Sequence, residues 1–149
     1  SAATILGQDQ WTWLETSISN SIADVIIILS SIQILATNHP YEKWDNFPLE
    51  RKRLLELIAK ASKEITIVAV TGDRHKSGIY QNENFLEITA SSLNKAASKG
   101  NETDPLLIGN IHPIINYGLL NIEPRKNIIT VSIHNKNGEE LNSKTINIH

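Results

Sequence analysis

The feature that most constrains this chain is a pair of short, mostly apolar runs. The runs are Val25–Leu29 and Ile65–Val70, and both have strand length and are rich in β-branched residues. Val25–Leu29 has no polar alternation, which is typical of a strand covered on both faces. It is therefore predicted to be a central strand, and Ile65–Val70 is predicted to be a second buried one.

The segment between the two runs predicts a crossover helix. Pro48 suits a first helical turn, because its missing N–H would be unpaired there in any case. Apolar side chains then follow at helical spacing: Leu54, Leu55, Ile58 and Ala61. Residues 25–70 therefore contain a strand, a helix and a strand in order, which is a βαβ unit with a parallel strand pair.

The flanking segments complete the expected fold. An amphipathic helix is predicted from Gln10 to Ile22, because its apolar residues recur every three or four positions. After the βαβ unit come short strand-like runs: Gly78–Tyr80, Asn84–Thr89, Ile115–Ile122, Asn127–His134 and Leu141–Ile148. Asn135–Gly138 predicts a hairpin turn between the last two, and residues 95–113 resemble a polar excursion. The predicted fold class is α/β (α+β), with a βαβ unit followed by antiparallel C-terminal strands.

Composition excludes several classes of protein. The 149 residues allow one ordinary domain or a piece of a larger one. A net charge of −2 gives no basic field for a phosphate backbone, so bulk nucleic-acid binding is not expected. The lack of cysteine excludes disulfides, thiolate zinc sites and cysteine nucleophiles. The longest apolar run is far shorter than the ~20 residues of a spanning helix, so no membrane span is expected.

The segment Gly72-Asp73-Arg74-His75, directly after the second strand, is the sharpest candidate for chemistry. Ligands of α/β sheets bind beyond the carboxyl ends of parallel strands, where this segment lies. Glycine allows a close turn, and a carboxylate and an imidazole two residues apart can face one cation. We expect Asp73 and His75 to lie within about 5 Å of each other at this edge. A solvated turn with an incidental histidine is the alternative, since one Asp and one His rarely form a complete metal site.

Several segments, taken in order, resemble one family of enzymes. They are Leu6–Glu15, Ser30–Gln33, Glu42–Arg51, Thr71–His75, Glu87–Asn94 and Tyr117–Ile122. Together with the closing hairpin, this ordered set resembles the alkaline phosphatase D (PhoD-like) family, which belongs to the calcineurin-type metallophosphoesterases. The resemblance covers nearly the whole chain.

The resemblance implies a β-sandwich flanked by helices that hydrolyses phosphate mono- or diesters. It also implies divalent or mixed metal ions in a dinuclear centre, with Zn, Mn, Fe or Ca as candidates. His75 matches the terminal ligand of the family's G-H-x-H-type loop. Asp73 stands where the wider superfamily often has the first histidine, so it is either a direct ligand or the partner of one.

The earlier metal motifs of the family are not found before Leu6; they are D-x-H, G-D-x-x-D and an Asn/Asp-His-Asp/Glu turn. Residues 1–149 therefore resemble the C-terminal portion of a metallophosphoesterase catalytic domain, half of its sandwich. The isolated chain is expected to be inactive. Its apolar sheet edge is expected to recruit the missing N-terminal half as a companion polypeptide, or to self-associate.

Four residues are candidates for binding a phosphate ester substrate: Arg74, Trp44, Asn46 and His39. Arg74 could neutralise a phosphate, and Trp44 could wall the pocket. Asn46 could bond phosphate, although Asn46 and Phe47 could equally just start the helix at Pro48. His39 lies in a long loop, where a histidine without chemistry is the alternative. No residue of the chain is assigned as catalytic.

Two functions stay open from the sequence. The first is metal-dependent hydrolysis of phosphate esters, with this chain supplying the C-terminal part of the site. The second is a non-catalytic truncated domain that acts as a binding or interaction module through uncovered strand edges. Export is common in the resembled family, which implies a periplasmic or secreted location.

Overall fold

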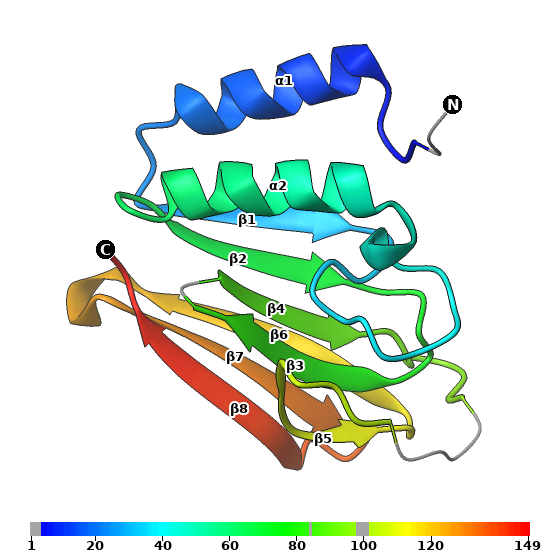
Figure 1. The fold of residues 1–149 in the computed structure, drawn as a ribbon. Helices are drawn as coiled ribbons and strands as arrows, with labels where there is room; N and C mark the ends of the chain where they lie inside the picture. The colour runs from blue at the N-terminus through cyan, green and yellow to red at the C-terminus, as the bar shows by residue number, and fades with distance from the viewer. Residues whose placement is uncertain (1–3, 84, 98–101) are drawn as a thin grey trace.

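The computed structural model describes residues 4–83, 85–97 and 102–149. Within them the helices are α1 (Gln8–Ser19) and α2 (Pro48–Ala61), with short 3-10 turns η1 (Trp44–Asn46) and η2 (Pro124–Lys126). The strands are β1 (Val25–Ser30), β2 (Thr66–Thr71), β3 (Ser77–Asn82), β4 (Phe85–Ala90), β5 (Leu107–His112), β6 (Asn116–Glu123), β7 (Ile128–Asn135) and β8 (Glu140–Asn147). They form two sheets that pack face to face, with both helices on one outer side (Figure 1).

The larger sheet contains the predicted βαβ unit. Its five strands are ordered β1-β2-β4-β3-β5. β1, β2 and β4 are parallel, whereas β3 pairs antiparallel with both β4 and β5. Because β1 and β2 are joined through α2, the parallel pair and its crossover helix confirm the sequence prediction.

The helices α1 and α2 cover one face of the larger sheet (Figure 1). Their apolar stripes bury Trp11, Leu54 and Ile58 against Ile67 of β2. A polar contact also fixes α1 to α2, since the indole N–H of Trp11 donates to a carboxylate oxygen of Glu50 at 2.8 Å. The apolar faces of both helices therefore pack against the core, as their amphipathic sequences predicted.

The smaller sheet, ordered β6-β7-β8, is antiparallel and covers the other face of the larger sheet. Alternate residues of its central strand, Ile129, Val131 and Ile133, are fully buried against the larger sheet. The predicted hairpin turn joins β7 to β8, and Gly138 takes the left-handed φ of 86° that favours glycine. The mixed α/β class with antiparallel C-terminal strands is confirmed.

The prediction that Val25–Leu29 is a central strand is wrong for this chain. β1 lies at the edge of the larger sheet, and Ile27 and Leu29 are 41% and 79% exposed. A wholly apolar run has the same sequence pattern whether its face is covered or open, so the pattern could not show the difference.

The end of the first helix and the polar segment 95–113 also differ from the predictions. α1 ends at Ser19, and Ile22 is fully exposed. Residues 95–113 contain β5, which pairs with β3 across a long stretch of sequence and has no apolar alternation to reveal it. Asn84, predicted to begin a strand, lies outside the described residues.

We expect Ile133→Ala to lower the free energy of unfolding by about 2–5 kcal/mol, because truncation leaves a cavity between the sheets. Leu119 on the neighbouring strand β6 is 48% exposed, so Leu119→Ala should cost less than about 1 kcal/mol. Urea unfolding followed by tryptophan fluorescence measures both variants. Equal losses would contradict the packing of the two sheets.

Candidate functional site

The carboxyl ends of the three parallel strands meet at one edge of the larger sheet. Ser30 lies in register with Thr71, and Thr71 lies in register with Thr89. Gly72 follows Thr71 beside the Ser31 backbone, and a Cβ added there would meet the Ser31 carbonyl oxygen at an ordinary contact distance of 3.6 Å. The candidate loop therefore begins at the middle of the edge where α/β sheets bind ligands.

Side chains along the loop after Gly72 alternate between exposed and buried. Asp73 and His75 are exposed, whereas Arg74 and Lys76 are buried. Asp73 and His75 both have left-handed backbone, with φ of 65° and 52°. Asp and His are among the few residue types enriched in this conformation, which lets the chain turn twice within four residues. The turn therefore leaves the predicted metal ligands exposed and buries the two cationic side chains.

The loop forms one wall of a hollow of about 290 Å³. The hollow is lined by Tyr41, Glu42, Asp73, Arg74, His75, Lys76, Lys95, Ala96 and Ala97. The structure therefore brings together three of the residues singled out from the sequence, namely Asp73, Arg74 and His75. The approach of Asp73 to His75 within about 5 Å stays a prediction.

One carboxylate pairs with both buried cations of the loop. Glu102 accepts hydrogen bonds from Nη2 of Arg74 at 2.7 and 2.8 Å and from Nζ of Lys76 at 2.6 Å. Burial favours a raised pKa for Glu102, but the hydrogen bonds and charges of Lys76 and Arg74 outweigh it and hold the pKa below its usual value. The guanidinium carbon of Arg74 also lies 4.6 Å from the ring centre of Tyr41. These contacts join the loop to two segments distant in sequence.

His39 is held neutral beside these cations. Burial, which is the largest cause, and the charges of Arg74 and Lys43 together lower its pKa to about 4. Its Nδ1 accepts the backbone N–H of Tyr41 at 3.2 Å, so the neutral ring carries its proton on Nε2. Nε2 is buried and has no partner among the described residues. His39 is therefore a hydrogen-bond donor and a weak base at neutral pH.

Trp44 and Asn46 do not line this hollow. Trp44 is 5% exposed within the helix-side core, and its indole N–H donates to the Ser30 hydroxyl at 3.0 Å. Asn46 is exposed and accepts a hydrogen bond from Nζ of Lys43. α2 does begin at Pro48, although the Asn46 side chain does not cap it. The proposed contacts of Trp44 and Asn46 with substrate stay predictions.

Sequence reasoning missed a buried carboxylate behind the loop. Glu87 in β4 is fully buried and accepts the backbone N–H groups of Ile34 and Leu35, the latter at 2.6 Å, and the hydroxyl of Thr71 at 2.8 Å. Burial raises its pKa to about 6, and these hydrogen bonds limit the rise. The signal was available, because Glu87 is the one charged residue within the otherwise buried strand Phe85–Ala90.

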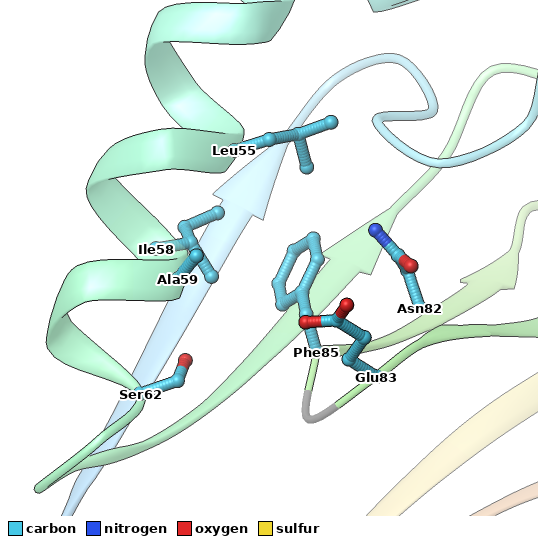
Figure 2. Close-up of a pocket in the computed structure, with 7 residues that line it drawn as sticks. All are labelled: Leu55, Ile58, Ala59, Ser62, Asn82, Glu83 and Phe85. Carbon is cyan, nitrogen blue, oxygen red and sulfur yellow. The ribbon is translucent and has the colours of Figure 1, made fainter.

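A second, smaller hollow lies at the opposite edge of the sheet (Figure 2). It measures about 60 Å³, and Figure 2 shows Ser62, Asn82 and Glu83 around it with Phe85. Since β4 begins at Phe85, this hollow marks the amino ends of the parallel strands, away from Asp73 and His75. It has room for a few water molecules.

The donors at the candidate site suit a divalent metal in kind but not in number. Asp73 and His75 offer a carboxylate and an imidazole, which bind Zn, Mn, Fe and related ions. Residues 4–83, 85–97 and 102–149 contain no group of three or more His, Cys, Asp or Glu side chains placed to hold a metal ion. The described chain therefore supplies part of a metal site and not a complete one.

A family model described as PhoD-like phosphatase matches residues 1–132. The chain belongs to the PhoD-like phosphatase family. The match includes the Gly72–His75 loop, the long loop with His39 and the buried Glu87. No curated protein matches the sequence significantly. The resemblance stated from the ordered motifs is confirmed.

A solved structure shares the fold of this PhoD-like chain. It is described as "GAP50 the anchor in the inner membrane complex of Plasmodium", with a TM-score of 0.77 and 18% sequence identity. The alignment covers 95% of this chain and 43% of that one, so this chain spans less than half of the length of its structural neighbour. Neither α1 nor α2 has the length and apolar character of a membrane-spanning helix, and the described residues offer no other candidate.

We expect Glu102→Gln to lower the free energy of unfolding by about 1–3 kcal/mol, because it leaves Arg74 and Lys76 buried without their shared anion. The matched control is Glu56→Gln, since Glu56 pairs with Lys52 on the exposed face of α2 and should cost less than about 0.5 kcal/mol. Urea titration at pH 7 compares them. A loss for Glu102→Gln no larger than that of the control would show that this carboxylate does not hold the loop.

Proposed function

We propose that residues 1–149 form the C-terminal portion of a metallophosphoesterase catalytic domain that hydrolyses phosphate mono- or diesters. The observation that carries the proposal is the exposed pair Asp73 and His75, presented by a strained turn at the carboxyl edge of the parallel strands. Membership of a phosphatase family supports the reaction class. The two packed sheets with helices on one outer side support the proposal that this chain would form half of a flanked sandwich.

Asp73 and His75 would hold a metal centre whose other ligands lie outside this chain. A dinuclear centre of Zn, Mn, Fe or Ca, when bound, polarises phosphoryl oxygens and lowers the pKa of water at the site. The exposure of both side chains on one hollow suits ligands that face a second polypeptide segment and a substrate. Asp73 acts either as a direct ligand or as the partner of one.

The remaining residues of the hollow would orient the substrate. His39 is not among the residues that line the hollow and its Nε2 is buried, so the geometry does not support its predicted contact with substrate. Arg74 supplies positive charge close to the metal ligands, although Glu102 already occupies one of its nitrogen atoms. Tyr41 is 55% exposed and offers an aromatic wall to the organic part of the ester.

The missing ligands would come from a polypeptide that covers β1. The free edge of β1, the exposed side chains Ile27 and Leu29, and Trp13 of α1 surround an apolar groove of about 380 Å³. An unpaired strand with exposed apolar side chains favours strand addition. Because this chain spans 43% of its structural neighbour, we assign the groove to an N-terminal half, either in the same polypeptide or as a companion chain.

A second candidate function is a non-catalytic binding module. The described residues hold no group of three metal donors, and the structural neighbour is described as an anchor. In that case the same groove beside β1 would bind a partner, and Asp73 and His75 would serve only the turn. The two functions differ in metal retention and turnover.

Turnover of p-nitrophenyl phosphate and its bis-ester with added divalent metal tests the proposed function. We expect none from this chain, and turnover from a version extended upstream through D-x-H and G-D-x-x-D motifs. In the extended version His75→Ala should lower kcat/KM more than about 100-fold, whereas His149→Ala, a histidine outside the hollow, should leave it unchanged.

Two results would contradict the proposal. Chelator-sensitive turnover by the isolated chain that disappears in His75→Ala would show that no second half is needed. An extended protein that neither retains metal nor turns over either ester would favour the binding module.

A further inference from the structure

We propose that Glu87 is a positioning residue for the candidate site. Its carboxylate holds the Gly72–His75 loop and the long loop after β1 in one fixed arrangement. The expected effect of Glu87 on catalysis rests on the proposed function, whereas its effect on the conformation of the two loops does not. Glu87 itself is fully buried and is not among the residues that line the hollow.

The first step of the argument is the contact with the end of β2. Thr71 is the last residue of β2 and immediately precedes Gly72, and its hydroxyl lies 2.8 Å from Oε1 of Glu87. Thr71 is itself buried, so this hydroxyl has no water to replace its partner. The bond therefore fixes the point from which the chain turns into the left-handed residues Asp73 and His75.

The second step is the clamp on the long loop. The backbone N–H groups of Ile34 and Leu35 donate to Glu87, at 3.2 and 2.6 Å. Arg51 binds the carbonyls of the same two residues, donating from Nε to Ile34 at 2.7 Å and from Nη2 to Leu35 at 2.9 Å. The peptide group between Ile34 and Leu35 is thus held between an acid and a base. Tyr41, which lines the hollow, follows on the same loop.

The third step is the direction of the hydrogen bonds that link Gln33, Thr89 and Thr71 to Glu87. Nε2 of Gln33 donates to the Thr89 hydroxyl at 2.9 Å, and that hydroxyl lies 2.8 Å from the Thr71 hydroxyl. Each hydroxyl has one proton, so Thr89 donates to Thr71, and Thr71 donates to Glu87. Three donors therefore converge on one carboxylate, whose two oxygen atoms accept all three. In Glu87→Gln, the side-chain amide N–H group would face at least one of these three donors.

Together these contacts explain how a turn with two left-handed non-glycine residues is maintained. Such conformations persist only where the surrounding structure over-determines them. The network supplies that constraint from behind, because it fixes both the strand end before the turn and the neighbouring loop. Removing it should leave the strands paired while the turn relaxes.

The structural arm of the test uses this chain and needs no activity. Residual dipolar couplings of the Asp73 and His75 N–H bonds are compared in wild type, Glu87→Gln, Thr71→Val and Thr71→Ser. Thr130→Val is the matched control, since Thr130 forms an exposed hydroxyl pair with Thr145 on the smaller sheet at 2.9 Å. We expect reoriented N–H bonds in Glu87→Gln and Thr71→Val, and wild-type couplings in Thr71→Ser, which restores the hydroxyl, and in the control.

The functional arm uses the version extended upstream, assayed at a temperature where every variant is folded. We expect kcat to fall about 10–100-fold in Thr71→Val with KM nearly unchanged, and to recover in Thr71→Ser. Unchanged couplings at Asp73 and His75 in both Glu87→Gln and Thr71→Val would overturn the inference. So would a kcat loss no larger than that of Thr130→Val. An extended protein with no turnover at all would count against the proposed function alone, because the couplings would still decide whether Glu87 positions the turn.

Discussion

The arrangement of the candidate site depends on one buried charge. Glu87 lies in the middle of β4 without exposure, where desolvation disfavours an ionised carboxylate. Three donors oppose that cost, and its pKa settles at about 6, above the ordinary value of 4.5. The folded state therefore binds this proton more tightly than the unfolded chain, so the contribution of Glu87 to stability is greatest below about pH 4.5 and falls as the pH rises through about 6.

The larger sheet around Glu87 is covered on both faces but open at its edge strand β1. The helix-side core and the inter-sheet core bury the strands on both faces over most of their length, which makes the carboxyl edge of β2 and β4 rigid. At β1 the cover ends, and Ile27 and Leu29 are exposed beside the groove. The carboxyl end of β2 therefore carries Asp73 and His75 on a buried sheet, whereas the edge strand β1 is open to pairing. Both follow from the same parallel order of strands.

The features that could be predicted from the sequence depend on residues close together along the chain. Helical periodicity predicted α2, the apolar runs predicted β1 and β2, and the strand-end rule placed Asp73 and His75 at a ligand-binding edge. It failed where partners are distant along the chain. Glu102 reaches Arg74 across 28 positions, and Glu87 reaches Ile34 across 53. No spacing pattern encodes such contacts, so the polar segment looked like an excursion and the buried carboxylate looked like part of a strand motif.

The account is tested most directly by a carbon-detected NMR titration of the Glu87 carboxyl group in this chain. We predict a midpoint near pH 6, with the amide protons of Ile34 and Leu35 shifting along the same curve because they donate to that carboxylate. A Glu87 midpoint at the ordinary value of 4.5, or a titration that leaves both amide protons unmoved, would contradict the claim that this buried charge organises the site.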